Sequence, residues 1–91
     1  MNGELPERSA NKLAAILMKE YASPAAQVDR AFNVVFQRPP RQQEKDRVMG
    51  FLTKATQTYE AGGATRADAE REAFAAFVKT LLATNEFLFL D

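Results

Sequence analysis

The chain has 91 residues, of which 46% are hydrophobic and 26% charged, with only four Gly and four Pro. This length suits one small domain, and the composition excludes a disordered chain or a low-complexity repeat. Twelve basic and twelve acidic residues cancel, so no strong overall field attracts nucleic acid or an anionic membrane. Because Cys and His are both absent, disulfides, thiol nucleophiles, imidazole catalysis, Cys/His zinc sites and covalent haem attachment are excluded.

Neither a membrane span nor a secretion signal is visible in the sequence. No apolar run approaches the ~20 residues that a transmembrane helix requires. Glu4 and Glu7 lie early in the chain, where a secretory signal would carry basic residues followed by an apolar stretch. We therefore expect a soluble domain without membrane insertion, and the residue types present predict no cofactor.

The first half of the chain predicts two helices, because residues 10–21 and 28–36 place apolar side chains at helical spacing. The apolar positions are Ala10, Leu13, Ala14, Leu17 and Tyr21 in the first stretch and Val28, Ala31, Phe32, Val35 and Phe36 in the second. Between the two, Ser23 suits an N-cap and Pro24 suits the first position of a new helix. The run Arg38-Pro39-Pro40 ends the second helix, because a residue before proline is driven toward extended geometry.

A third helix is predicted after the double proline. Its inward positions are Val48, Phe51, Leu52, Ala55 and Tyr59. Its N-cap would be Arg41 or Pro40, both poor capping residues. Gly50 in its interior costs roughly 1 kcal/mol relative to Ala unless a neighbouring backbone packs closely there. Gly62-Gly63 supplies a left-handed stop.

The fourth helix is predicted to begin with Thr65 and Asp68, which resemble a capping box. Its inner positions are Ala73, Phe74, Phe77, Val78, Leu81 and Leu82. Asn85 suits a left-handed exit, and the apolar residues after it form either one more turn or an extended strap. Short joints between the four helices favour antiparallel packing of sequence neighbours. We therefore predict an all-α fold, a compact four-helix arrangement in which an up-down antiparallel bundle is preferred.

Two sequence motifs resemble a known family. The first is the run from Asp29 to Pro40 (DRAFNVVFQRPP), and the second is the run from Leu81 to Asp91 (LLATNEFLFLD). Together they resemble the C-terminal region of a planctomycete-type family, the domain of unknown function 1553. In that family an R-A-F/Y…GRPP helix end is followed by a closing LLN-S/T-NEFL-F/Y.

The resemblance implies that residues 1–91 are a single helical domain at the C-terminus of a larger, exported protein, in which a haem-binding cytochrome-like segment lies far upstream. No activity is established for the family, so no catalytic residue is carried over. Gln37 stands where the family has Gly, which predicts that the second helix ends without a left-handed residue.

A basic cluster surrounds the joint between the second and third helices. Its members are Arg38, Arg41, Lys45 and Arg47. Such clusters are the electrostatic footprint of phosphate and nucleic-acid binding. Residues 38–47 hold four positive and two negative side chains, and no aromatic residue alternates with the basic ones for base stacking. We favour a solvated helix start, with weak nucleic-acid binding as an alternative.

Other candidates for chemistry are weak. Asp68, Glu70 and Glu72 could supply oxygen ligands to a hard cation, but acids in a first helical turn are favoured by the helix dipole alone. The nucleophile types Ser9, Ser23 and Lys79 lack a recognisable constellation. We therefore predict no metal site and no catalytic residue in the isolated domain, and leave the activity of the parent protein open.

Two structural features are predicted near the C-terminus. If the second and fourth helices run parallel, their ends share one pole, and Arg38 would form a charge-assisted hydrogen bond with Glu86. Phe87 and Phe89 lie beyond the expected helix end, where they either fold back onto the core or form an exposed interface with another surface.

Three functions follow as hypotheses. The first is a non-catalytic helical module that caps or docks within its parent protein or onto another protein. The second is an accessory part of an enzyme whose active site lies upstream, which a buried carboxylate facing a cleft would favour. The third is a weak nucleic-acid binder through the basic cluster. The sequence does not predict an oligomeric state, and export is implied by the resemblance alone.

Overall fold

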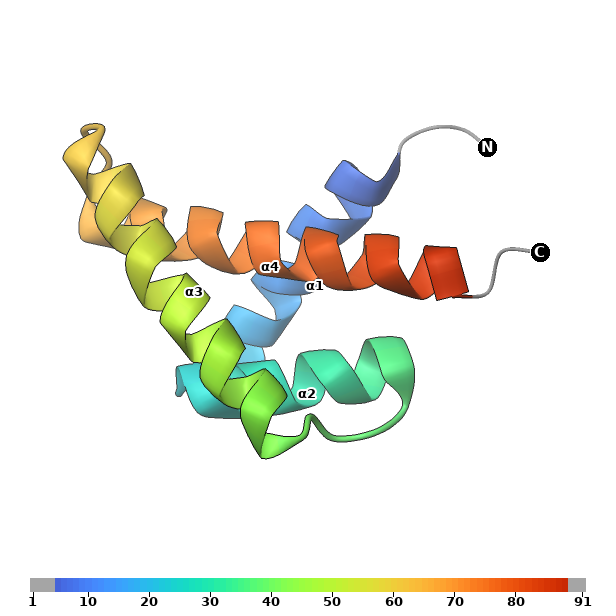
Figure 1. Cartoon of the computed structure of the whole chain (residues 1–91). Helices are drawn as coiled ribbons and strands as arrows, with labels where there is room; N and C mark the ends of the chain where they lie inside the picture. Colours follow the sequence, from blue (N-terminus) through green and yellow to red (C-terminus); the bar gives the residue numbers. More distant parts are fainter. Residues whose placement is uncertain (1–4, 89–91) are drawn as a thin grey trace.

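The computed structural model describes the backbone of residues 5–88 and the side chains of residues 8–84. Four helices make up this part of the chain: α1 (Leu5–Glu20), α2 (Pro24–Phe36), α3 (Gln42–Ala61) and α4 (Arg66–Leu88). Successive helices alternate in direction across the view, and α3 lies obliquely over the others (Figure 1). The predicted all-α, four-helix fold is confirmed. None of the described helices combines the length and apolarity needed to cross a membrane.

Three of the predicted helix boundaries are confirmed in atomic detail. The hydroxyl oxygen of Ser23 accepts a hydrogen bond from the Ala26 N–H at 3.1 Å, and Pro24 begins α2. The hydroxyl oxygen of Thr65 accepts from the Asp68 N–H at 3.1 Å, at the start of α4. Gly63, just beyond the end of α3, adopts a φ of +110°, a conformation that glycine reaches without steric cost.

The end of α2 differs from the expectation drawn from the family. Gln37 has φ 60° and ψ 35°, which is the left-handed conformation, and its N–H bonds to the Asn33 carbonyl at 2.9 Å. The prediction of an end without a left-handed residue is therefore wrong. The reason is the double proline: Arg38 precedes Pro39 and is driven toward extended geometry, so the reversal out of the helix falls on Gln37.

The core is centred on α4, which packs most extensively against α1 and α3. Phe77 links α4 to α2, because its ring lies 6.2 Å from that of Phe32 on α2, and it also contacts Phe74 on α4, with 5.5 Å between the ring centroids. Val28 and Val78 are fully buried. Buried alanines on three helices let the backbones approach closely: Ala10, Ala14, Ala31, Ala69 and Ala73. The inward positions predicted for α2 and α4 are confirmed where their side chains are described.

The orientation of α3 corrects the sequence prediction. Three of the five predicted inward residues are confirmed, since Leu52 is buried and Val48 and Ala55 pack against the core. Phe51 and Tyr59 are instead 45% and 38% exposed, and Thr56, which was not predicted, is buried. Leu52 and Thr56 lie one turn apart, so the buried face of α3 runs along the Leu52 side of the predicted stripe and leaves the Phe51 side exposed. Packing against α4 sets this orientation, since the apolar residues of α3 lie on more than one face of the helix.

The C-terminal part differs from the prediction at Asn85, and as far as Leu88 it takes the first of the two predicted forms, one more helical turn. α4 continues through Asn85 to Leu88 instead of leaving the helix at Asn85, because Asn is tolerated in a helix and no Gly or Pro follows it. The side chain of Phe87 and all of Phe89 lie outside the described residues. Their predicted choice between core and interface therefore stays a prediction.

Candidate functional site

Ion pairs at the α2–α3 joint occupy two of the four residues of the basic cluster. The Arg38 guanidinium donates two hydrogen bonds to the Glu44 carboxylate, Nη1 to Oε1 and Nη2 to Oε2, each at 2.9 Å. The Lys45 ammonium lies 2.8 Å from an Asp29 carboxylate oxygen, across to α2. Two of the four cations are thus neutralised by carboxylates, while Arg41 and Arg47 extend exposed side chains.

Glu44 links the joint to the start of α3. Besides pairing with Arg38, its Oε1 accepts a hydrogen bond from the Arg41 N–H at 2.8 Å, and so caps one of the unpaired amides at the helix N-terminus. The hydrogen bonds from Arg38 and then from the Arg41 backbone lower the pKa of Glu44 from 4.5 to about 2. The same pairing raises the pKa of Arg38. Glu44 is therefore a fixed negative charge at neutral pH.

Arg38 is also held by aromatic rings. Its guanidinium carbon lies 5.7 Å from the centroid of Phe32 and 5.6 Å from that of Phe36, within the range of cation–π attraction. This places the Arg38–Glu44 pair over the aromatic end of the core. The side chain of Glu86 lies outside the described residues, so the predicted Arg38–Glu86 pair stays a prediction.

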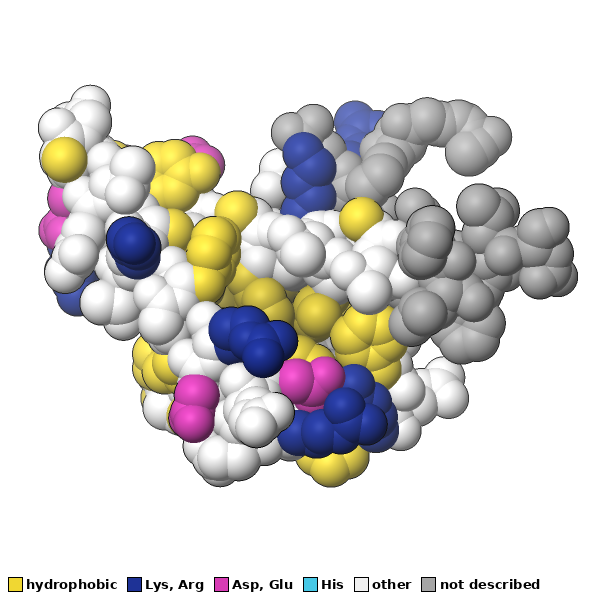
Figure 2. Space-filling model, in the orientation of Figure 1, with side chains coloured by type: hydrophobic (Ala, Val, Ile, Leu, Met, Phe, Trp, Pro, Cys, Tyr) yellow, Lys and Arg dark blue, Asp and Glu magenta, His cyan; other side chains and the backbone are white. Residues whose placement is uncertain are grey.

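A groove lies beside this joint, between α3 and α4. Its volume is about 380 Å³, and it is lined by Phe32, Glu44, Arg47, Val48, Phe51, Phe77 and Thr80. Figure 2 shows the corresponding hollow near the centre of the visible face, with a yellow floor and charged side chains along its lower edge. Arg47 and Phe51 are one helical turn apart on α3, so both lie on the side of α3 that lines the groove.

The other candidate residues do not come together in one site. Asp68 pairs with Arg71, Glu70 pairs with Arg66, and Glu72 is exposed. Among the side chains of residues 8–84, no three potential metal ligands converge. Ser9 and Lys79 are exposed on different helices, and the hydroxyl of Ser23 serves as the α2 cap.

Comparisons with protein-family models, with curated proteins and with solved structures gave no match to this chain. The family resemblance therefore rests on the two sequence motifs and stays a prediction.

Sequence reasoning missed the partner of Arg38 and the groove. Glu44 lies three residues after Arg41, which is the capping-box position. From that spacing the hydrogen bond between the Glu44 side chain and the Arg41 N–H could have been predicted. The sequence does not show whether Phe51 lies in the core or in a groove, because an apolar residue suits both positions.

Proposed function

We propose that this domain is a non-catalytic helical interaction module, whose α3–α4 groove binds an amphipathic helix carrying acidic residues beside its apolar face. The observation that carries the proposal is the half-exposed ring of Phe51 next to Arg47, above a floor made by Phe32 and Phe77. Aromatic and arginine side chains over an apolar pocket are the composition of binding hot spots. Grooves of this kind take helices through residues spaced one turn apart.

Charge supports an acidic occupant. Around the groove, Glu44 is already committed to Arg38, and Asp46 accepts a hydrogen bond from Gln42. The exposed Arg47 at the rim has no ion-pair partner among the described side chains. An approaching carboxylate would therefore gain an attractive partner, while a basic helix would meet repulsion.

The distribution of acids also favours a non-catalytic role over an accessory enzyme part. Every described carboxylate side chain is partly or fully exposed, whereas an acid poised for catalysis gains its altered pKa from burial in a cleft. On the family resemblance, the occupant helix would come from the rest of a larger, exported parent protein. Another protein could present the same chemistry.

A pair of designed peptides tests the proposal. Each is an amphipathic helix of about four turns with the same leucine face, one flanked by Glu and the other by Lys. Fluorescence anisotropy should show that the domain binds the Glu peptide more tightly. Phe51→Ser should weaken binding at least tenfold, the loss of about 1.4 kcal/mol or more expected for an interface anchor. The matched control Ile16→Ser removes an exposed apolar side chain from α1 and should leave binding unchanged.

Charge reversal sharpens the test. Arg47→Glu should reduce affinity for the Glu peptide and raise it for the Lys peptide, since the rim contact changes sign. Equal binding of both peptides to the unmodified domain, or a loss with Ile16→Ser as large as that with Phe51→Ser, would rule out the groove as the binding surface. Retention of the domain on heparin, abolished by Arg47→Glu, would favour the nucleic-acid alternative instead.

A further inference from the structure

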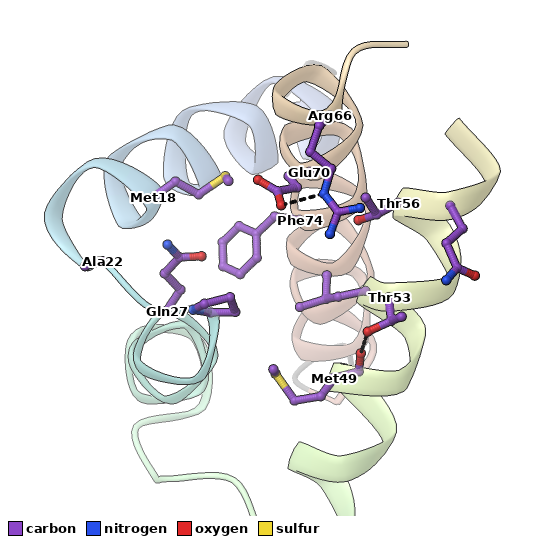
Figure 3. A pocket seen from close by; sticks show the side chains of 12 residues that line it. Met18, Ala22, Gln27, Met49, Thr53, Thr56, Arg66, Glu70 and Phe74 are labelled. Carbon is purple, nitrogen blue, oxygen red and sulfur yellow. Dashed lines mark hydrogen bonds and ion pairs between the residues drawn. The ribbon is translucent and has the colours of Figure 1, made fainter. Parts of the chain in front are cut away.

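A second, more polar pocket lies on a different part of the molecule, where the α1–α2 corner meets α3 and the first half of α4 (Figure 3). Its volume is about 370 Å³, which falls within the size range of small-molecule sites. Met18, Met49, Leu52 and Phe74 form its apolar walls. The ring of Phe74 occupies the middle of the view, with Met18 and Met49 on either side.

Gln27 presents an unpaired acceptor to this pocket. The side chain is only 6% exposed, and its Nε2 donates a hydrogen bond to the Tyr21 carbonyl at 2.8 Å. A carbonyl oxygen only accepts, so this bond fixes the orientation of the amide and leaves Oε1 on the other side. In Figure 3 the amide extends from α2 toward Met18 and the ring of Phe74. No described residue donates a hydrogen bond to Oε1.

Thr56 presents an unpaired hydroxyl from the opposite wall. A threonine within a helix commonly donates its hydroxyl to the carbonyl four residues earlier. The exposed helical threonines do so at 2.8–3.1 Å, namely Thr53, Thr58, Thr80 and Thr84. Thr56, which is only 6% exposed, makes no such bond and has no other partner among the described residues. Two polar groups that are more than nine-tenths buried thus face one pocket unsatisfied, which is unusual in a folded protein.

The charges at the mouth of the pocket are already paired. Arg66 donates from Nε to Glu70 and from Nη1 to Glu60, each at 3.1 Å. This triad leaves no isolated charge that calls for an ionic ligand. Among the buried residues of the described lining, the polar groups left without a partner are the Oε1 acceptor of Gln27 and the hydroxyl of Thr56.

We propose that this pocket binds a small uncharged molecule that carries an amide group beside an apolar body. The amide N–H donates to Oε1 of Gln27, and the amide carbonyl accepts from the Thr56 hydroxyl. The apolar body packs on Phe74 and between the two methionines, whose flexible side chains adapt to its shape. The site is separate from the α3–α4 groove and does not depend on the function proposed for that groove.

Benzamide and benzoate test the proposal, because they share a ring and differ in the group that meets Gln27 and Thr56. Each is titrated into the full chain and followed by two-dimensional ¹H–¹⁵N NMR. Benzamide should shift the amide signals of Thr56 and Phe74 with a Kd on the order of 1 mM, as expected for a fragment of this size. Benzoate should bind at least tenfold more weakly, because it lacks the N–H donor and carries a charge.

Matched threonine variants locate the contact. Thr56→Val keeps the side-chain shape and should weaken benzamide binding about fivefold, the loss of one hydrogen bond. Thr53→Val is the control: Thr53 lines the same pocket, but its hydroxyl is already donated to the Met49 carbonyl, so binding should not change. Circular dichroism verifies that both variants fold.

Three results would overturn the proposal: no shifts at Thr56 and Phe74 with benzamide, equal binding of benzoate, or equal affinities in the two valine variants. The first would mean that water alone satisfies the two buried groups. If Thr56→Val fails to fold, the comparison of benzamide with benzoate on the unmodified chain still decides the outcome.

Discussion

Replacing Glu44 by Gln removes one negative charge from the α2–α3 joint and leaves a side chain of almost the same size. The Gln oxygen still accepts a hydrogen bond from the Arg41 N–H, because Gln serves as well as Glu at this capping position. The same oxygen also accepts from Nη1 of Arg38, so the substitution removes the second hydrogen bond, from Nη2 to Oε2 at 2.9 Å, and the carboxylate charge that strengthens both. We expect it to lower the free energy of unfolding at pH 7.

The size of the effect follows from the pKa of Glu44. The hydrogen bonds from Arg38 and from the Arg41 N–H together lower that pKa from 4.5 to about 2. At about 1.36 kcal/mol per unit, the upper limit for both contributions is about 3 kcal/mol. Solvent reduces this value, because the side chains of Arg38 and Glu44 are 40% and 26% exposed. A loss of about 1 kcal/mol is the appropriate expectation for a well-aligned ion pair of this exposure. In a domain of this size it corresponds to a fall in Tm of about 4–8 °C.

The contribution of Glu44 to stability depends on pH. The folded pKa of Glu44 lies below the unfolded value of 4.5, so its stabilising contribution is fully present above that value and is lost as pH falls toward 2. Urea unfolding followed by circular dichroism at neutral pH, at pH 4 and near pH 2 measures this contribution. The difference between the unmodified chain and Glu44→Gln should shrink across this window and vanish at its lower end.

Glu72→Gln is the matched control, because Glu72 is exposed on α4 and has no ion pair among the described residues. It should change stability by no more than about 0.5 kcal/mol, as is usual for a surface substitution. Equal stabilities of the unmodified chain and Glu44→Gln at pH 7 would refute the reasoning. A difference that stays constant from pH 7 to pH 2 would refute it as well.

Two backbone predictions follow from the helix geometry. Gly50→Ala should raise the free energy of unfolding by about 0.5–1 kcal/mol in the same urea assay. An added Cβ meets no atom within 4 Å, and the substitution removes the flexibility of Gly from the unfolded chain. A lower free energy of unfolding would show that a neighbouring group packs against Gly50. Gln37→Gly should also stabilise, by up to about 1 kcal/mol, because Gln37 holds a left-handed φ of 60° that costs a residue with a Cβ. If Gln37→Gly lowered the free energy of unfolding instead, the Gln37 side chain would stabilise the fold by more than the strain of its left-handed backbone costs.

The parts of the fold that could be predicted are those in which local pattern and tertiary packing agree. On α2 and α4 the apolar residues recur without interruption, so Phe32 and Phe77 face the core as expected. The caps at Ser23 and Thr65 follow from hydrogen bonds within four residues. These interactions are local, and a sequence encodes them directly.

The rest depends on contacts between segments far apart in the sequence. α3 carries apolar residues on more than one face, so its rotation is decided by α4, which buries Leu52 and exposes Phe51. The second pocket was missed for a related reason. Gln27 and Thr56 are polar residues that only the assembled helices bury, and no periodicity of apolar residues singles them out.

The most direct test of the account is a ¹H–¹⁵N NMR map of where the acidic helical peptide binds. If the α3–α4 groove is the interaction surface, the largest shifts should fall on the backbone amides of Val48, Phe51 and Thr80, with little change around Ile16 on α1. Shifts centred on α1, or none at saturating peptide, would contradict it.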